Sequence, residues 1–142
     1  MRLTAFTDFG LRTLMYLASL EEDQLSSVAE VSGVYGVSRS HMVKVIGQLA
    51  KSGYVQTIRG KNGGIRLARQ PDLINIGDVI EQLENHLDGV DCVTTSCQLA
   101  PCCELKSALM KGMQAFIEAM RQYTLADLIV NKRQLIPLMS AG

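Results

Sequence analysis

Residues 34–69 read VYGVSRSHMVKVIGQLAKSGYVQTIRGKNGGIRLAR, and they predict a helix followed by a β-hairpin. Ser38 is suited to cap a helix over residues 39–51. Strands over residues 54–59 and 65–69 then flank GKNGG, a run that tolerates the backbone conformations of a tight turn. The apolar residues that we expect to face inward from the helix are Met42, Val43, Ile46, Leu49 and Ala50.

Two further helices are expected before this unit. Apolar residues recur at helical spacing over residues 5–20. Ser27 and Glu30 have the spacing of a capping box at the start of a short helix over residues 28–34, and Gly36 lies in the turn that follows. Helix, helix, tight turn, helix and two-stranded hairpin is the order of a winged helix-turn-helix. The sequence therefore predicts a mainly α fold with a small β-hairpin wing.

The C-terminal half is expected to be helical around one irregular loop. An acidic helix over residues 76–87 precedes the loop, and a long helix from about Glu104 carries an apolar stripe as far as Tyr123. Too little chain remains to cover that stripe, so we expect it to pack on a second copy, with folding back on its own domain as the alternative. A second capping box at Thr124 starts a short helix, and the tail after Asn131 is expected to be frayed. The predicted parts are a DNA-binding domain (1–87), a cysteine loop (88–103), and a dimerisation helix with a C-terminal tail (104–142).

The charges are divided sharply along a chain whose net charge is zero. Seven basic residues and no acidic one lie between Arg39 and Gln70, whereas seven acidic residues and no basic one lie between Pro71 and Glu104. The basic segment suits the phosphates of double-stranded DNA, and two solvated faces of opposite sign are the alternative. The candidate DNA contacts, at the start of the third helix and at the wing tip, are Ser38, Arg39, Ser40, His41, Lys44, Arg59, Lys61 and Asn62.

Several classes of protein are disfavoured. The first residues lack the apolar stretch of a signal peptide, and no run is long and apolar enough to span a bilayer. We therefore expect a cytoplasmic protein with no membrane partner. Neither a nucleophile–base pair nor a phosphate-cradling loop after a buried strand is recognisable, so the sequence does not predict an enzyme.

All four cysteines, Cys92, Cys97, Cys102 and Cys103, lie in the predicted loop. A disulfide is disfavoured because the cytosol keeps thiols reduced. A reactive thiolate needs basic neighbours, and the neighbours here are acidic, whereas a metal centre supplies its own positive charge. Adjacent side chains such as those of Cys102 and Cys103 diverge, which is awkward for one tetrahedral zinc ion. The chemistry of the loop therefore favours an iron–sulfur site over zinc.

The chain also resembles a known family over nearly its whole length. The likeness is carried by LTAFTDFGLR (3–12), VYGVSRSHMVKVIGQLAKSGYV (34–55), IRGKNGGIRL (58–67), IGDVI (76–80) and YTLADLI (123–129). These segments resemble the iron–sulfur repressors of bacteria, the group that includes IscR and NsrR, and look most like the nitric-oxide-sensing NsrR type. IscR-like members have a His three residues after the last ligand cysteine. Lys106 stands there in this chain, so an IscR-type site is not supported.

The resemblance implies a homodimer with one cluster per subunit, [4Fe-4S] being favoured over [2Fe-2S]. It implies Cys92, Cys97 and Cys103 as ligands. Cys102, one residue from the ligand position, could substitute for Cys103, and we expect it to be a bystander. The resemblance also implies Asp8 of the partner subunit as the fourth ligand, although Asp8 four residues before Arg12 is by itself an ordinary surface pair. Nitric oxide would nitrosylate the cluster and displace the weak carboxylate ligand, so that the altered separation of two winged helices releases a palindromic operator.

Two other functions remain open at the level of sequence. One is an iron–sulfur sensor of cluster supply or redox state with the same fold. The other is a zinc-stabilised or metal-free DNA-binding module, in which the cysteines only hold the loop.

Overall fold

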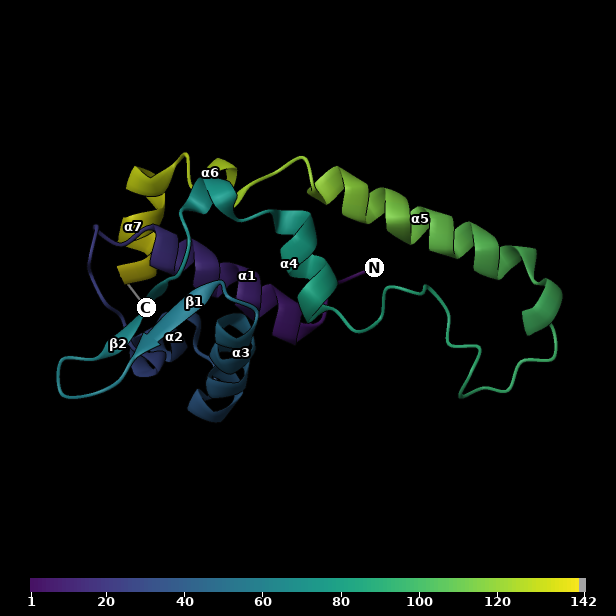
Figure 1. The fold of residues 1–142 in the computed structure, drawn as a ribbon, viewed down its shortest axis with the longest axis horizontal. Helices are drawn as coiled ribbons and strands as arrows, with labels where there is room; N and C mark the ends of the chain where they lie inside the picture. The colour runs from purple at the N-terminus through teal and green to yellow at the C-terminus, as the bar shows by residue number, and fades with distance from the viewer. Residues whose placement is uncertain (141–142) are drawn as a thin grey trace.

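The computed structural model describes residues 1–140 and is mainly helical (Figure 1). A two-stranded antiparallel sheet interrupts the helices. Short 3-10 turns lie at Pro71–Leu73 and Ala100–Cys102. The elements are α1 (Ala5–Ala18), α2 (Val28–Tyr35), α3 (Arg39–Lys51), β1 (Val55–Ile58), β2 (Gly64–Leu67), α4 (Ile76–Leu83), α5 (Glu104–Met120), α6 (Leu125–Leu128) and α7 (Lys132–Ser140).

The ends of α2 and α3 follow from their capping residues. Ser27 accepts a hydrogen bond from the Glu30 amide at the start of α2. The Glu30 carboxylate does not complete the predicted capping box, because it accepts from the Ser26 hydroxyl at 2.7 Å instead. Gly36, with a φ of 63°, ends α2 in the left-handed conformation that glycine adopts without strain. The two helices are thereby separated by the short turn expected of a helix-turn-helix.

The wing is a β-hairpin attached to the helical body. Strand β1 pairs with β2 in antiparallel register, with Val55 opposite Leu67 and Ile58 opposite Gly64. The amide and carbonyl of Ile65 also exchange hydrogen bonds of 2.9 Å with Ser26, just before α2. The base of the hairpin is therefore held against the helix-turn-helix, and the predicted winged helix-turn-helix is confirmed.

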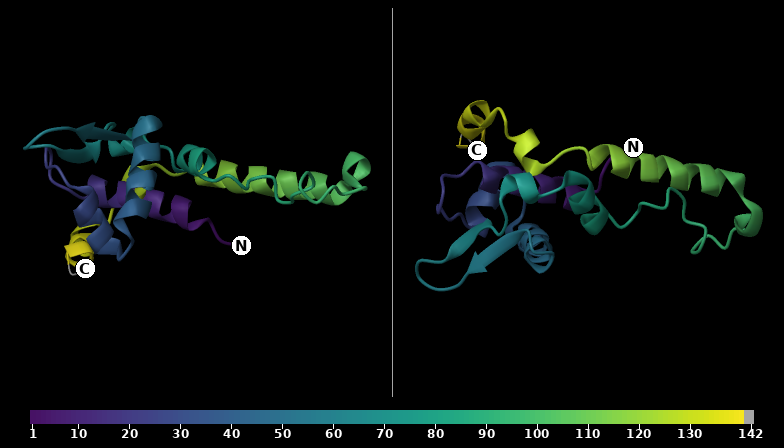
Figure 2. Two further views of the ribbon diagram at one scale, coloured as in Figure 1. Left: turned by 90° about the horizontal axis from the view of Figure 1, so that it is seen from below. Right: turned by 45° about the horizontal axis from the view of Figure 1, so that its top comes forward.

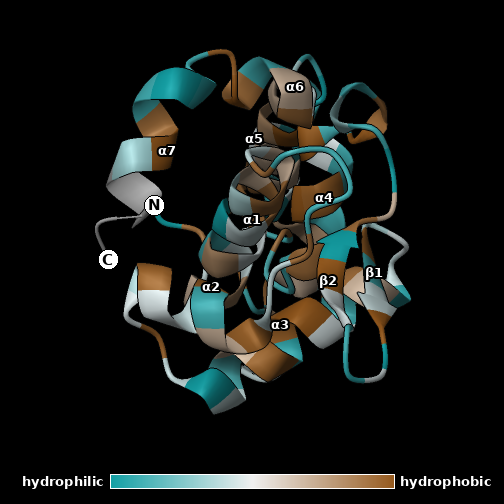
Figure 3. Ribbon diagram, turned by 90° about the vertical axis from the view of Figure 1, so that its left-hand side faces the viewer, coloured by the Kyte–Doolittle hydropathy of each residue, from teal (hydrophilic) through white to brown (hydrophobic). Residues whose placement is uncertain are grey.

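Helix α1 lies at the centre of the core (Figure 3). It packs against α3, α4, α6 and β2, and its buried apolar residues are Leu14 and Leu17. The inner face of α3 differs from the prediction at two positions, since Val43 is 51% exposed and Val45 is buried. The other buried apolar residues are Val31, Met42, Ile46, Leu49, Tyr54, Val55, Ile65, Ile74, Ile76, Val79, Ile80, Leu83, Ile117 and Leu125.

Helix α5 projects from this body as an arm (Figures 1 and 2). Ile117, near its base, is its one buried residue. The segment between α4 and α5 runs back beside the arm, and a Cβ added at Gly89 would lie 2.8 Å from the Leu109 Cβ. Helix α4 ends at Leu83, earlier than predicted, and Glu84 continues in an extended conformation.

The C-terminal tail contradicts the expectation of a frayed end. Residues Lys132–Ser140 form α7, which includes Pro137. The Lys132 ammonium donates to the carbonyl of Leu20, just after α1, at 3.4 Å. The chain thus returns to the DNA-binding domain after the arm. In the described part of the chain, no helix has the length and apolar character needed to cross a membrane.

Gly77 marks a close approach between α4 and α5. A Cβ at this position would lie 2.7 Å from the Arg121 amide nitrogen and 2.8 Å from the Ile117 carbonyl oxygen. We expect Gly77→Ala to lower the free energy of unfolding by about 1–3 kcal/mol, because the backbone of α5 must move away. Chemical denaturation measures the change.

Gly33→Ala in α2 is the matched control, because a Cβ there has no neighbour within 4 Å. We expect it to stabilise the protein by about 0.5–1 kcal/mol through helix propensity. Equal effects of the two substitutions would contradict the close approach at Gly77.

Candidate functional site

The start of α3 presents polar side chains to solvent. Ser38 caps the helix by accepting a hydrogen bond from the His41 amide at 3.3 Å. Ser38, Arg39, Ser40 and Lys44 are all exposed. None of the described acidic residues pairs with Arg39 or Lys44 within salt-bridge distance. This end of α3 can therefore offer hydrogen-bond donors and positive charge to a polyanion.

The structure places His41 differently from its exposed neighbours. Its half-buried ring meets the rings of Phe6 and Phe9 edge-on, with centroids 6.3 and 5.8 Å away. The Nε2 atom is buried and has no hydrogen-bond partner among residues 1–140. The ring thus lies in the contact between α1 and α3, away from the polar face that includes Arg39.

Sequence reasoning missed Val43 as part of the exposed face of α3. Its neighbours one turn away, Arg39, Ser40 and Gly47, are all exposed, whereas Val45 is buried. Because these polar and small residues recur at the 3.6-residue helical period, they could have indicated that Val43 lies on the exposed face of α3. An apolar side chain therefore stands among the polar groups at the start of the helix.

The wing tip gathers the second set of predicted contacts. Arg59, Lys61 and Asn62 are exposed around the turn, in which the Gly63 amide donates to the Gly60 carbonyl at 3.0 Å. Gly60 has a φ of 107°, a conformation that favours glycine. The hairpin thus holds two cations and an amide at its outermost point (Figure 1).

Two of the seven basic residues in this region have partners within the chain. Arg66 donates to Gln56 across the hairpin at 3.0 Å and lies 3.8 Å from Asp23. The Arg69 guanidinium lies over the Tyr54 ring, 4.9 Å from its centroid. These two cations stabilise the base of the wing, and the exposed charge is concentrated at its tip and on α3.

The cysteine loop begins with a turn built on Asp91. Its side chain accepts hydrogen bonds from the Val93 and Thr94 amides at 3.2 and 2.9 Å, and also from the Thr94 hydroxyl. The hydrogen bonds from Thr94, side chain and then backbone, lower the pKa of Asp91. The Thr95 hydroxyl donates to the Asp91 carbonyl at 2.5 Å. Asp91 therefore shapes the chain directly before and after Cys92.

Further backbone turns connect the four cysteines. The Cys97 amide donates to the Cys92 carbonyl at 3.4 Å, and the Cys102 amide donates to the Leu99 carbonyl at 3.1 Å. All four thiols are free. Cys92 and Cys103 are half-buried, whereas Cys97 and Cys102 are exposed. The adjacent pair is therefore split, with Cys102 in a 3-10 turn and Cys103 at the cap of α5.

The donor set of the loop fits an iron–sulfur cluster by its chemistry. Thiolates are the usual ligands of such clusters, and the loop offers four thiols that no disulfide occupies. Within residues 1–140 of this single chain, however, no three Cys, His, Asp or Glu side chains are gathered closely enough to hold a metal ion. The loop thus has the ligand types and does not by itself converge them.

Asp8 lies in the first turn of α1 and is engaged with Arg12. The Arg12 Nε donates to the Asp8 Oδ1 at 2.8 Å, and the Asp8 side chain is 41% exposed. The structure does not bring Asp8 together with the cysteines of its own chain. Its ion pair is the ordinary i,i+4 pair that the sequence predicts.

Glu84 ties the start of α1 to the end of α4, where the chain leaves for the cysteine loop. The buried carboxylate accepts from the Thr4 amide and hydroxyl at 2.9 and 3.1 Å. Burial would raise the pKa of Glu84, but the hydrogen bonds from Thr4 and Thr7 outweigh it and lower this pKa. Sequence reasoning missed this residue, because its partner lies far away in the chain.

A family model matches residues 3–131 and is described as Rrf2, iron-dependent transcriptional regulator. The chain belongs to the Rrf2 family. The solved structure of IscR from T. potens shares 27% identity with this Rrf2 protein at a TM-score of 0.71, covering 92% of this chain and 88% of that one. CymR (YrzC), the global cysteine regulator of B. subtilis, shares 25% identity at a TM-score of 0.69, covering 90% and 95%. CymR of Staphylococcus aureus, at 21% identity and a TM-score of 0.70, covers 89% and 97% and shows the shared fold.

Family membership confirms the broad predictions from sequence. The Rrf2 chain is a DNA-binding transcriptional regulator and not an enzyme. Its winged helix-turn-helix is the fold of these solved relatives.

The bonds of Glu84 predict a pH-dependent effect of its removal. At pH 7 we expect Glu84→Ala to lower the free energy of unfolding by about 1.5–3 kcal/mol, because Thr4 loses a charged acceptor. The pKa of Glu84 in the folded state lies below its ordinary 4.5. In wild type the Glu84 carboxylate therefore stabilises the fold above pH 4.5, and this stabilisation is lost as the pH falls through the pKa of the folded state.

Denaturant unfolding of wild type and variant between pH 7 and pH 3 measures the effect. The difference should shrink as the pH falls below about 4.5. Glu22→Ala, at an exposed position, should change little at any pH. A difference for Glu84→Ala that stays constant with pH would show that its negative charge is not responsible.

Proposed function

We propose that this Rrf2 protein is a homodimeric repressor that releases operator DNA in response to nitric oxide through an iron–sulfur cluster. The observation that carries the proposal is the placement of two features on one chain. An exposed basic wing lies at one end of the long axis, and a loop of four free thiols lies at the other, beside α5 (Figures 1 and 2). Such a chain is built to read DNA and to detect a signal at separate places.

The DNA-reading part of the proposal rests on side-chain exposure. Arg39, Lys44, Arg59 and Lys61 have no described acidic partner and stand on α3 and the wing tip. Their charges are available to phosphates, and Ser38, Ser40 and Asn62 are available for base edges or the backbone. His41 supports the position of α3 from behind through Phe6 and Phe9.

The dimer is proposed from the surface of α5. Leu105 and Met110 are 62% and 43% exposed, and Leu109 and Met113 are only half-buried. A 17-residue helix with one buried residue leaves apolar area that a second copy would cover. Two copies joined through this arm would present two wings to a palindromic operator.

The proposed cluster ligands are Cys92, Cys97 and Cys103, with Asp8 of the partner subunit as the fourth and [4Fe-4S] as the favoured form. When bound, a cluster with one oxygen ligand supplies an iron that a small neutral ligand such as nitric oxide can approach. The chain's own part is to hold the loop through the Asp91 turn and to release Asp8 from Arg12, a pair worth only a few tenths of a kcal/mol. Cys102, which lies in the 3-10 turn, is proposed as a bystander.

Replacing Lys61 by Ala tests the wing. We expect weaker binding to all DNA sequences alike and a plot of log affinity against log salt that is flatter by about one unit, because one phosphate contact is lost. Lys111→Ala, at an exposed position of α5, should leave the slope unchanged. An unchanged slope for Lys61→Ala would remove this residue from the phosphate contacts.

Single Cys→Ser substitutions test the cluster assignment. Anaerobically prepared protein is assayed for iron and acid-labile sulfide per subunit and for affinity to its selected operator. We expect Cys92→Ser, Cys97→Ser and Cys103→Ser to lower the cluster content and the operator affinity. Cys102→Ser should match wild type in both measurements. Wild-type protein that binds zinc, or no metal, would contradict the iron–sulfur proposal. If Cys102→Ser loses the cluster and Cys103→Ser retains it, then Cys102 is the ligand and Cys103 is the bystander.

A further inference from the structure

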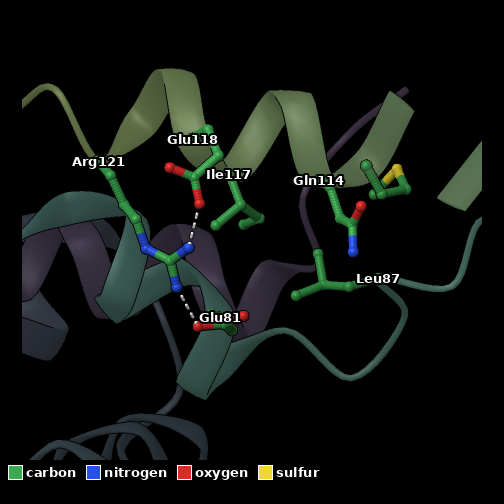
Figure 4. Close-up of a pocket in the computed structure, with 7 residues that line it drawn as sticks. Glu81, Leu87, Gln114, Ile117, Glu118 and Arg121 are labelled. Carbon is green, nitrogen blue, oxygen red and sulfur yellow. Dashed lines mark hydrogen bonds and ion pairs between the residues drawn. The ribbon is translucent and has the colours of Figure 1, made fainter. Parts of the chain in front are cut away.

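One arginine joins the DNA-binding domain to the arm. Arg121, at the end of α5, donates from Nε to Asp78 at 2.9 Å and from Nη2 to Glu81 at 2.6 Å, both on α4. Its Nη1 donates to Glu118 at 2.5 Å, one turn earlier on α5 (Figure 4). All three nitrogens of the guanidinium are thus used, and two of the three bonds cross between helices.

Hydrogen bonds also join the backbone next to Arg121 to the start of α4. The Asn75 side chain accepts from the Asp78 amide at the start of α4 and donates to the Arg121 carbonyl at the end of α5, at 3.2 and 2.8 Å. The Ile76 amide donates to the Tyr123 carbonyl at 3.0 Å. Together with the close approach at Gly77, these bonds make the start of α4 and the end of α5 one joint.

A groove of about 310 Å³ begins at this joint and lies between α5 and the end of α4 with the residues after it (Figure 4). Leu87, Met113 and Ile117 line it together with the joint residues Glu81, Glu118 and Arg121. Beyond Ile117 the arm is exposed or half-buried throughout its length. The angle of the arm is therefore set at its base, where small changes move the far end most.

We propose that Arg121 is a positioning residue that sets the angle between α5 and the winged helix, and through it the spacing of two half-sites on DNA. The inference rests on the proposed dimer and deepens it. If two copies meet along their arms, a rotation at each base changes the separation of the two wings. Arg121 then acts on operator choice without touching DNA.

The chemistry of arginine explains why this residue suits the joint. Its planar fork fixes the direction of each hydrogen bond, which a lysine ammonium does not do. The hydrogen bonds with Asp78 and then Glu118 raise the pKa of Arg121 further, so the cation persists at every physiological pH. Without it, Asp78, Glu81 and Glu118 would face one another as three unpaired carboxylates, and their repulsion would open the joint.

The experiment measures preference for half-site spacing. The probe is an inverted repeat selected from a random duplex library on the anaerobically prepared full-length wild-type dimer, together with versions that have one or two base pairs inserted or removed at the centre. We expect Arg121→Met to reduce the ratio of affinities between the selected and altered spacings on the order of tenfold. Affinity for a single half-site should be unchanged, since the reading residues are distant from the joint.

Two further variants separate positioning from simple loss of structure. Asp78→Asn combined with Glu81→Gln removes the charges across the joint without leaving carboxylates unpaired, and it should relax the spacing preference as Arg121→Met does. This variant decides the matter if Arg121→Met does not fold. Glu118→Gln removes the contact within α5 alone and should keep the wild-type preference.

Three results would overturn the inference. In the first, the Asp78→Asn/Glu81→Gln variant and a folded Arg121→Met protein both keep the wild-type preference. In the second, half-site affinity falls in parallel, which indicates general loss of structure. In the third, wild type itself shows no preferred spacing, which would also refute the proposed reading of a palindrome. The first two leave that proposal intact.

Discussion

The packing of α4 between α1 and α5 is the constraint on which the two parts of this molecule depend. On one side, Leu83 lies against Gly10, where an added Cβ would meet its side chain at 2.5 Å, and Glu84 is bonded to Thr4. On the other side, Arg121 and Asn75 tie the helix to the base of the arm. Eight residues thus link the central helix of the DNA-binding domain to the helix that carries the cysteine loop. Polar bonds hold both ends of this link, and the apolar contacts between them give it rigidity.

This arrangement gives the proposed signal a physical route. The wing and the cysteine loop lie at opposite ends of the long axis of the molecule (Figure 1). In the proposed mechanism a change in the loop would pass along α5 and α4, or through a second copy whose α1 would supply the proposed ligand Asp8. Both routes end at α1, whose Phe6 and Phe9 support the recognition helix through His41. Packed elements of this kind transmit small displacements because they resist continuous deformation.

The sequence was informative where local patterns decide the structure. Ser38 caps α3 and Thr124 completes a capping box with Asp127, because such bonds span only a few residues. The hairpin follows from its glycine-rich turn in the same way. Val43 was misjudged because burial on a short helix depends on which neighbouring element the helix packs against. Here α1 covers the side of α3 that bears His41 and leaves Val43 outside. Helix α4 ends before the predicted residue 87 because the Glu84 carboxylate accepts a hydrogen bond from Thr4, eighty positions away in the chain.

The candidate site was predictable in its ligand types and not in its geometry. Cysteine spacing and acidic neighbours favour a metal-binding loop, but a single chain leaves the thiols apart and Asp8 paired with Arg12. Arg121 and Asn75 have no motif around them, since their partners lie more than forty positions away. Such contacts become visible only when helices are placed in three dimensions.

In the proposed mechanism the cysteine loop, when it holds a cluster, controls DNA binding at the far end of the molecule. Titration of nitric oxide into an anaerobic complex of cluster-loaded protein and its selected operator tests it most directly, with fluorescence anisotropy of the DNA as the signal. We expect release of the DNA as nitric oxide is added, and no response from cluster-free protein bound to the same DNA. A complex that persists in excess nitric oxide, or equal release from the cluster-free protein, would contradict it.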